Sequence, residues 1–286
     1  MHLLRRRLAA VPILLASVLL AQAAHAQAPT PWEVDMQPGF SPIKRDIIAL
    51  NWLVFVIITL ITIFVGVLLA WALYRYHHRR HPVPTRVSHN TPLEIAWTVI
   101  PILILVIIAI PSFRLVYYED RAQNPDLTVK VTGHQWNWEY TYPDQGGLDY
   151  ASHVVPDQNL KPGQLRLLSV DNPLVLPVGK RVRILTTSAD VIHSFFIPSL
   201  GEQRYAIPGQ TLETWVQVDK PGVYYGECNQ ICGTGHSVMP IEVHGVSDAE
   251  FQQWVKQTKE QQNAENGAAP AAPAATAAPQ LAEARH

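Results

Sequence analysis

The residues with the clearest chemical potential lie together in the segment 226–240, which reads GECNQICGTGHSVMP. It holds both cysteines of the 286-residue chain, Cys228 and Cys232, and then His236 and Met239. Two cysteines in an oxidising compartment usually form a disulfide, and the cysteines alone leave that alternative open. A thiolate, an imidazole and a thioether in one loop are also the soft ligands that select copper in electron-transfer sites.

A copper site of this kind needs a second imidazole from elsewhere in the chain. A mononuclear blue-copper centre takes two histidines, one cysteine and a weak axial ligand. The segment ADVIHSFFIP offers His193 at the end of a β-rich run, which leaves Cys228 unexplained by a single copper. A second thiolate four residues before Cys232 lets two sulfurs face one point and bridge two metal ions, so the cluster has ligands for two coppers.

The elements that must hold these residues are short strands. From about 127 to 246 the chain alternates apolar and polar residues in runs such as LTVKV and TLETWVQV, separated by turn sequences such as LPVGK and KPGV. This pattern is typical of an antiparallel β-sandwich of about 120 residues. Ser247 and Glu250 have the spacing of a capping box before an apolar stripe, which predicts a short helix after the sandwich.

Two apolar runs, 53–73 and 95–113, precede the strands. Each is long enough to cross a hydrocarbon core of about 30 Å as a helix. Prolines inside the second run are tolerated where neighbouring helices satisfy the freed backbone groups, so this helix is expected to pack against other protein. By the positive-inside rule the loop between the runs is cytoplasmic and everything after Phe113 is outside, because the loop carries Arg75, Arg79, Arg80 and Arg86.

The two ends of the chain and its charge complete the picture. A positive region, an apolar core and the small residues AHA in the first 26 residues predict a cleaved secretory signal, the alternative being a short membrane anchor. The last residues are rich in Ala and Pro and predict a disordered tail. A net charge of −1 argues against a protein that binds nucleic acid.

The fold class predicted is a two-helix transmembrane hairpin followed by an all-β, cupredoxin-like Greek-key sandwich. The predicted order along the chain is a signal peptide at 1–26, an exported N-terminal segment at 27–48, a transmembrane helix at 49–76, a cytoplasmic loop at 77–90, a second transmembrane helix at 91–118, the exported copper domain with its short C-terminal helix at 119–262, and the tail at 263–286.

From about 41 to 255 the chain resembles subunit II of a bacterial-type haem–copper cytochrome c oxidase. The resemblance rests on YYGECNQICGTGHSVMPIEV, ADVIHSFFIPSLG, GHQWNWEYTYPD and EIAWTVIPILILVIIAIPSFRLVYYED. It implies a binuclear copper centre, Cu(A), whose ligands would be Cys228 and Cys232 as bridging thiolates, His193 and Met239 on one copper, and His236 with the backbone carbonyl of Gln230 on the other.

The resemblance also gives roles to residues with simpler explanations. Trp136 would receive electrons from cytochrome c, although as a bare pattern the aromatic run of Trp136, Trp138 and Tyr140 on one strand face indicates packing. Asp171 and Glu139 would belong to an acidic patch that steers a basic partner, the alternative being an ordinary solvated face.

Glu94 has two compatible interpretations. In TPLE, Thr91 is expected as the N-cap and Glu94 as the third helical residue, a capping box that needs no further function. The resemblance places Glu94 at the cytoplasmic mouth of a proton pathway. Relatives often carry carboxylates where this chain has Gln230 and Tyr205, and a neutral amide is a poor ligand for a hard cation. These departures weaken the expectation of the family's magnesium or manganese ion at the boundary with subunit I.

The function implied is that of the subunit where electrons from reduced cytochrome c arrive at Cu(A) and pass to the haem centres of subunit I, which reduces oxygen to water with proton translocation. The expected partners are subunits I and III, cytochrome c and the membrane. The expected location is the bacterial inner membrane, with the copper domain on the periplasmic side. The competing classes are a copper-free quinol oxidase subunit, which would lack the cysteines, and a membrane-tethered copper carrier or sensor, against which Glu94 and the proline-interrupted helix argue.

Overall fold

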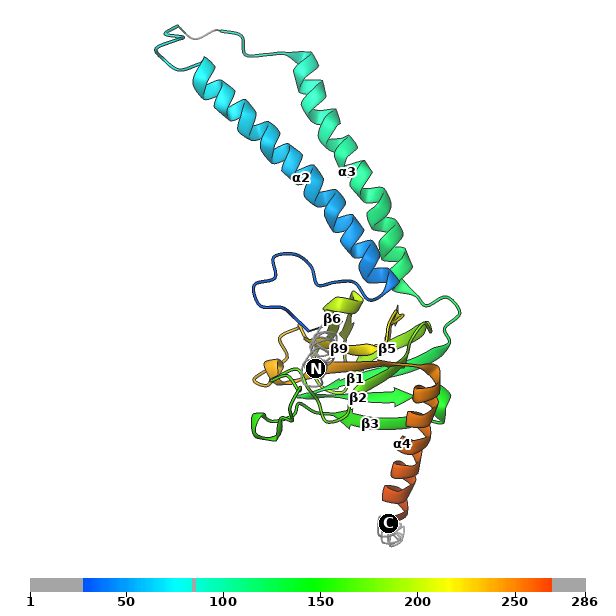
Figure 1. The fold of residues 1–286 in the computed structure, drawn as a ribbon. Helices are drawn as coiled ribbons and strands as arrows, with labels where there is room; N and C mark the ends of the chain where they lie inside the picture. Colours follow the sequence, from blue (N-terminus) through cyan, green and yellow to red (C-terminus); the bar gives the residue numbers. More distant parts are fainter. Residues whose placement is uncertain (1–27, 84–85, 269–286) are drawn as a thin grey trace, which may run out of the picture.

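The structure, a computed structural model, describes residues 28–83 and 86–268. In Figure 1 two long helices stand on one end of a β-sandwich, and a third helix leaves the sandwich near the C-terminus. The predicted signal peptide and the chain beyond 268, which holds most of the predicted tail, lie outside the described residues.

Two apolar helices form the hairpin, α2 over Pro42–Arg75 and α3 over Thr91–Asp120. Both are long and apolar enough to cross a membrane. Their large apolar side chains are exposed along most of their length, because the sandwich contacts only the ends of the helices. A surface of this kind requires lipid or other membrane helices around it.

The first helix begins at Pro42, earlier than the predicted 49, because its N-terminus is built into the sandwich. Ser41 is the N-cap, and its side chain accepts a hydrogen bond from the Lys44 N–H at 3.0 Å. Its hydroxyl donates to the carbonyl of Leu200 at 2.5 Å. Pro42 at the first helical position suits a helix start, since its missing N–H would be unsatisfied there in any case.

The second helix is capped by Asn90, so the prediction of Thr91 as N-cap was wrong. The Asn90 side chain accepts a hydrogen bond from the Leu93 N–H at 3.2 Å. Asn is a stronger N-cap than Thr, and the position directly before Thr91 brings its oxygen within reach of the third helical N–H.

The sandwich consists of two five-stranded sheets, ordered β3-β2-β1-β5-β8 and β4-β10-β9-β6-β7. The predicted sandwich is confirmed, but two of its pairings are parallel, β1 with β5 and β4 with β10, so the sheets are mixed where antiparallel ones were expected. Long connections between the sheets bring these strands side by side in the same direction. The strands are β1 Leu127–His134, β2 Asn137–Tyr142, β3 Leu148–Ser152, β4 Leu174–Pro177, β5 Val182–Ser188, β6 His193–Ile197, β7 Glu202–Ala206, β8 Leu212–Val216, β9 Gly222–Cys228 and β10 Pro240–Val246.

Aromatic side chains fill the space between the sheets. Along β2, Trp138, Tyr140 and Tyr142 alternate into the core and are fully buried. Trp136 precedes the strand and is only partly buried, so the predicted row of three aromatic residues on one strand face is divided. The core therefore accounts fully for Trp138 and Tyr140, whereas Trp136 packs against the edge of the core and stays partly exposed.

The terminal helix α4, Asp248–Ala268, extends beyond the predicted limit of 262. It packs Trp254 against Tyr142, with ring centroids 5.2 Å apart. The predicted capping box is confirmed: the Glu250 N–H donates to the Ser247 hydroxyl at 3.3 Å, and the Ser247 N–H donates to the Glu250 carboxylate at 2.9 Å. Reciprocal bonds of this kind satisfy two backbone donors that the helix cannot satisfy itself.

The outer end of α3 is fixed to the sandwich through its last backbone carbonyls, which have no partner within the helix. These carbonyls are contacted by side chains of β7 and β8. The pairs are Trp215 with Tyr118 at 2.8 Å, Thr214 with Glu119 at 3.5 Å and Arg204 with Asp120 at 3.4 Å. The outer end of α3 is therefore attached to the sandwich by side-chain hydrogen bonds.

Replacing Ser247 by Ala is expected to lower the free energy of unfolding of the sandwich by about 1 kcal/mol, because the substitution removes the side-chain cap of α4. A urea titration of the full chain followed by tryptophan fluorescence measures the change. Ser247→Asp keeps an acceptor and should remain close to the parent chain. An equal loss in both variants would contradict the capping role.

Candidate metal centre

Two strand ends and one loop bring the predicted ligands together. His193 is the first residue of β6, and Cys228 is the last residue of β9. These strands are paired antiparallel, with Phe195 opposite Cys228, so the start of one meets the end of the other. Cys232, His236 and Met239 follow in the loop between β9 and β10, gold at the left of the sandwich in Figure 1.

The donor atoms of this loop lie within a few ångströms of one another. The Sγ atoms of Cys228 and Cys232 are 3.8 Å apart, and both residues are buried free cysteines. A disulfide requires about 2.05 Å between the sulfurs, so the disulfide alternative is not the state of this structure. The remaining contacts are Cys228 Sγ to His193 Nδ1 at 3.9 Å, Cys228 Sγ to the Gln230 carbonyl at 3.3 Å, Cys232 Sγ to His236 Nδ1 at 3.6 Å, and Cys232 Sγ to Met239 Sδ at 3.6 Å.

The orientation of His193 is determined by its other ring nitrogen. Nε2 lies 2.9 Å from Asp190 Oδ1, which leaves Nδ1 facing the sulfur of Cys228. The backbone of β1 lies against the ring, since a Cβ at Gly133 would be 2.8 Å from it. A carboxylate on the second ring nitrogen is the usual support for a metal-binding imidazole.

Asp190 is the functional residue that the sequence analysis missed. A carboxylate three residues ahead of the expected ligand His193 was a usable signal in the sequence. The Asp190 carboxylate also accepts hydrogen bonds from the N–H groups of Gln135 and Val191, both at 2.6 Å. Asp190 therefore connects the ligand strand with the turn before β2.

Trp136 and Gln135 cover the loop from the side of this turn. The Gln135 side chain donates to the Cys232 carbonyl at 2.8 Å, and the Trp136 indole N–H donates to the same oxygen at 3.4 Å. The indole also lies directly on Gly235, where any side chain would collide with the ring. Trp136 is thus partly exposed to solvent on one side and hydrogen-bonded on the other to the backbone of Cys232, a predicted ligand.

Trp138 supports the opposite side of the site. Its indole N–H donates to the Met239 carbonyl at 3.1 Å, and its ring meets His193 edge-on with centroids 5.9 Å apart. Because Trp138 is fully buried, its position is set by the core. Two predicted ligands from distant parts of the sequence, His193 and Met239, are therefore held by one core side chain.

The pKa values of the two thiols are shifted in opposite directions. Burial acts to raise the pKa of the Cys228 thiol, but hydrogen bonds with His193 and with nearby backbone outweigh it and hold the pKa at about 6. Burial, followed by the charge on Cys228, raises the pKa of Cys232. Cys228 is therefore the first of the two to become the thiolate that a metal requires.

The donor set fits copper better than a hard cation. Ligand atoms of His193, Cys228 and Cys232 all lie within 4.8 Å of one another, and no other group of three His, Cys, Asp or Glu residues does so among residues 28–83 and 86–268. Thiolate, imidazole and thioether donors together select soft metals, copper above all. The residues present thus suit a copper centre.

The structure places the remaining predicted residues away from the donor loop. Glu94 lies in the first turn of α3, at the far end of the hairpin, where its carboxylate accepts from the Asn90 N–H at 3.3 Å and lies 2.8 Å from His89. Its role as a helix cap is visible, one position displaced from the expected box. Tyr205, on β7, is 45% exposed and offers no carboxylate, so the weakened expectation of a magnesium or manganese ion is unchanged.

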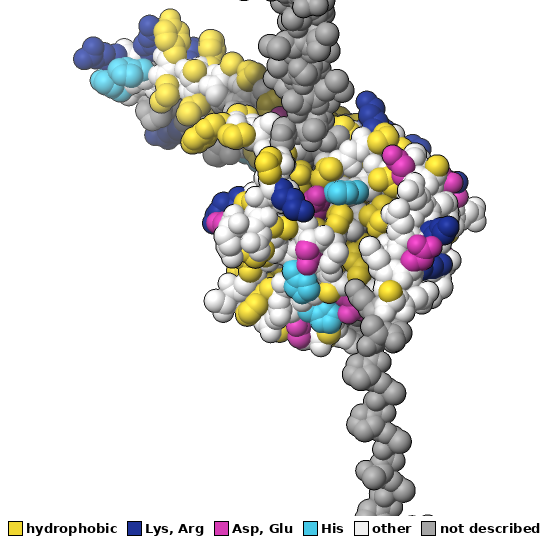
Figure 2. Space-filling view, turned by 60° about the horizontal axis from the view of Figure 1, so that its bottom comes forward, with side chains coloured by type: hydrophobic (Ala, Val, Ile, Leu, Met, Phe, Trp, Pro, Cys, Tyr) yellow, Lys and Arg dark blue, Asp and Glu magenta, His cyan; other side chains and the backbone are white. Residues whose placement is uncertain are grey.

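Both predicted docking carboxylates are paired with histidines. Asp171 Oδ2 lies 3.4 Å from His153 Nδ1, and Glu139 Oε2 lies 3.2 Å from His134 Nε2. Figure 2 shows acidic side chains and histidines interspersed with apolar ones on the exposed face of the sandwich. The charge that these pairs present to a partner depends on the protonation of the histidines.

Comparisons with known proteins assign the whole architecture to one family. The chain matches the family models "Cytochrome C oxidase subunit II, periplasmic domain" over residues 127–246 and "Cytochrome C oxidase subunit II, transmembrane domain" over residues 29–115. Among curated relatives, a probable cytochrome c oxidase subunit 2 of Rickettsia bellii is 46% identical over 242 residues, covering 85% of this chain and 90% of the relative.

A plant protein and a solved domain are also similar. Cytochrome c oxidase subunit 2 of Arabidopsis thaliana is 43% identical over 234 residues, covering 80% of this chain and 90% of that protein. The crystal structure of the periplasmic domain of subunit II of cytochrome oxidase from Bradyrhizobium japonicum is 45% identical, with a TM-score of 0.46, and the match covers 49% of this chain and 97% of that chain.

Replacing Asp190 by Asn is expected to weaken copper binding by roughly 10- to 100-fold, because the amide no longer fixes the tautomer and orientation of His193. Competition with a calibrated copper chelator measures the affinity. Asp149→Asn changes an exposed carboxylate on β3 and serves as the matched control. Unchanged affinity in the Asp190 variant would show that its carboxylate only shapes the turn.

Proposed function

This chain belongs to the cytochrome c oxidase subunit II family, and we propose that it is the subunit through which electrons enter the oxidase. As a subunit II it is part of a haem–copper oxidase complex, and catalysis is carried by that complex. In the proposed reaction, reduced cytochrome c gives up one electron at a time to a binuclear copper centre on this chain. The electron then passes to the haem centres of subunit I, where oxygen is reduced to water with proton translocation.

The observation that carries this proposal is the convergence of two buried thiols and two imidazoles where the loop after β9 meets the start of β6. A second thiol 3.8 Å from the first has no purpose in a one-copper site, whereas two thiolates can bridge two metal ions. In the proposed centre Cys228 and Cys232 would hold both coppers, His193 and Met239 would complete the ligands of one, and His236 with the carbonyl of Gln230 would complete those of the other.

When bound, such a centre takes up and releases a single electron that is shared by two metals and two sulfurs. The contribution of this chain is to keep the ligands in place while the charge changes. His193 is fixed by Asp190 and by the backbone at Gly133, and Met239 is fixed through Trp138. Side chains packed this closely have little room to rearrange, which favours rapid electron transfer over chemistry at the metal.

Trp136 is proposed as the point where the electron reaches this chain. Its indole is partly exposed, lies on Gly235 and donates to the carbonyl of Cys232, so a short covalent and hydrogen-bonded path runs from the surface to a bridging sulfur. Asp171 and Glu139 are proposed to attract a basic cytochrome c toward this region by long-range electrostatics.

The hairpin supports the proposed placement in the membrane. Its arginine-rich loop lies at the opposite end from the sandwich. By the positive-inside rule this arrangement supports the proposal that the copper domain is on the periplasmic side of a bacterial inner membrane. The exposed apolar surfaces of α2 and α3 are proposed to pack against subunit I and subunit III. Glu94, at the cytoplasmic end, is proposed to admit protons to subunit I in addition to capping α3.

A copper-free quinol oxidase subunit is the second candidate from the same superfamily. Nothing in its function requires two cysteines, a methionine and two histidines to converge at one point of the sandwich. A lone copper carrier is disfavoured for a different reason, since an extensive apolar surface on both helices calls for membrane partners.

The full chain loaded with copper is expected to hold two copper ions and to show the purple colour and near-infrared band of a mixed-valence pair. Metal analysis and absorption spectroscopy on the same sample test this. Cys232→Ser removes one bridging sulfur and should abolish the near-infrared band. A ratio of one copper per chain, or a Cys228–Cys232 disulfide that persists in copper-loaded protein, would overturn the proposal.

Trp136→Phe is expected to lower cytochrome c oxidation by the assembled oxidase roughly tenfold or more, a barrier increase of about 1.4 kcal/mol. Phenylalanine lacks the N–H that meets the Cys232 carbonyl, while no metal ligand is lost. Copper content and cytochrome c affinity should stay near normal. Trp254→Phe, on α4, is the matched control, and full turnover in the Trp136 variant would reduce this indole to a packing role.

A further inference from the structure

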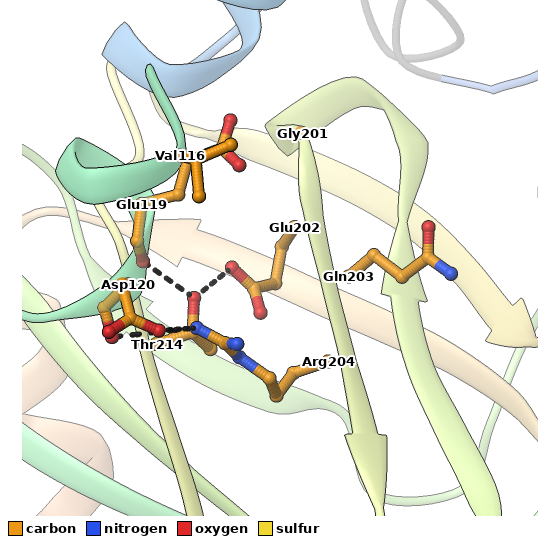
Figure 3. A pocket seen from close by; sticks show the side chains of 8 residues that line it. All are labelled: Val116, Glu119, Asp120, Gly201, Glu202, Gln203, Arg204 and Thr214. Atoms are coloured by element: carbon orange, nitrogen blue, oxygen red, sulfur yellow. Dashed lines mark hydrogen bonds and ion pairs between the residues drawn. The ribbon is translucent and has the colours of Figure 1, made fainter. Parts of the chain in front are cut away.

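A small cavity of about 120 Å³ lies at the junction between the outer end of α3 and the sandwich. Figure 3 shows that it is lined by the last residues of α3, by the start of β7 and by Thr214 of β8. The cavity is remote from the ligand loop, and the proposed electron path does not use it. Its most unusual member is Glu202.

Glu202, the first residue of β7, is a buried carboxyl group that is only half satisfied. Its side chain is 2% exposed. One carboxyl oxygen, Oε2, lies 3.0 Å from the Thr214 hydroxyl, and the other, Oε1, is buried and has no hydrogen-bond partner among the residues that the structure describes. An ionised carboxylate in such a place loses hydration that the protein does not replace, which strongly disfavours the charged form.

The hydrogen-bond geometry around Thr214 also favours the neutral acid. The Thr214 oxygen lies 3.0 Å from Glu202 Oε2 and 3.5 Å from the Glu119 carbonyl, yet a hydroxyl has a single proton to donate. If Glu202 is ionised, one of the two acceptors goes without that proton. If Glu202 is protonated, it donates to Thr214, and Thr214 donates to the Glu119 carbonyl, so both contacts are hydrogen bonds.

The neighbouring charges do not replace the lost hydration. Arg204, on the same strand, already binds Asp120, at 3.3 Å from its carboxylate. Glu119 of α3 acts to raise the pKa of Glu202. The pKa of Glu119 is itself raised, mainly by burial, with Arg204 opposing the shift and Asp46 of α2 adding to it. Glu213 of β8 points to the opposite face of its sheet and accepts from the Ala122 N–H, while β6 offers the apolar Ile197 opposite Glu202.

Together these effects give Glu202 a pKa near physiological pH. Burial raises its pKa from 4.5 to about 8; the Thr214 hydrogen bond and the Arg204 charge act in the opposite direction, and Glu119 raises it further. A metal is a poorer occupant than a proton. Within the residues described, the carboxylates of this cavity do not converge on one point as the His193, Cys228 and Cys232 donors do.

We propose that Glu202 is a proton-binding site: it carries one proton at neutral pH, joins β8 to the end of α3 through Thr214, and exchanges that proton with solvent through the junction cavity. The chemistry is a simple acid dissociation in which the carboxyl O–H bond breaks and the proton leaves to water. No electron moves, and the site functions with or without copper. The junction between membrane helices and copper domain is thereby linked to the pH of the outer compartment.

The effect on stability has a definite sign. The pKa of Glu202 is raised from 4.5 to about 8, so the folded chain holds a proton that the unfolded chain has released. The stabilisation is fully present below the lower value and is lost as the pH rises toward the higher one. Glu202→Gln, which has no proton to lose, removes this part of the pH dependence.

Infrared spectroscopy of the full chain in lipid nanodiscs tests the proposal directly. The carbonyl band of a protonated carboxylic acid should be present at about pH 6 and lost by about pH 10, with a midpoint near the value above. Glu202→Gln should remove this band. Glu260→Gln, an exposed carboxylate on α4, should leave it in place.

Two further measurements decide the outcome. The thermal unfolding midpoint of the parent chain should fall more steeply between about pH 5 and pH 8 than that of Glu202→Gln, and Glu260→Gln should follow the parent. The proposal would be overturned if the carboxylic acid band survives in Glu202→Gln. It would also be overturned if the parent chain shows no such band at neutral pH, because Glu202 would then already be ionised. Loss of the band on addition of calcium at constant pH would also overturn it, since the site would then hold a cation.

Discussion

The close approach of two buried thiol groups is the constraint on which this structure depends. Sulfur atoms 3.8 Å apart, each with an imidazole nitrogen within 4 Å, must be held by something stiffer than the loop itself. The pairing of β6 with β9 supplies that stiffness, because it fixes His193 and Cys228 on adjacent strands. The remaining ligands then need only a short loop whose two ends are already anchored.

Hydrogen bonds from side chains outside the ligand set hold this loop in position. Gln135 and Trp136 both contact the carbonyl of Cys232, and Trp138 contacts that of Met239. Together these donors satisfy two backbone oxygens next to predicted ligand side chains. The turn before β2 therefore positions the ligand loop as much as the loop's own sequence does.

The sequence predicted the parts that depend on local spacing. The positions of Cys228, Cys232, His236 and Met239 indicated a soft-metal loop, alternation indicated strands, and long apolar runs indicated the two membrane helices. The parts that escaped prediction depend on contacts between distant segments. The early start of α2 depends on Leu200, which accepts a hydrogen bond from the Ser41 cap, and the parallel pairings depend on crossovers between sheets.

Glu202 is a second example of a feature that could not be predicted from local sequence. In a strand that reads EQRYA, nothing local says whether the glutamate faces water or the protein. Its burial follows from the end of α3 closing over β7 and β8, a contact between residues more than eighty positions apart. Likewise the supporting carboxylate of Asp190 becomes recognisable only when the imidazole of His193 is seen to turn toward it.

The side-chain contacts to the last carbonyls of α3 have a mechanical consequence. The side chains of Trp215, Thr214 and Arg204 donate hydrogen bonds to the last carbonyls of α3. Because of these bonds, the helix and the sandwich move together when the helix tilts in the membrane. Transmembrane helices tilt to match the thickness of the hydrocarbon layer around them. A thinner bilayer tilts α3 further, and the attached sandwich must tilt with it. One side of the sandwich then moves toward the lipid headgroups. The lipid composition therefore affects the orientation of the donor loop relative to the membrane surface.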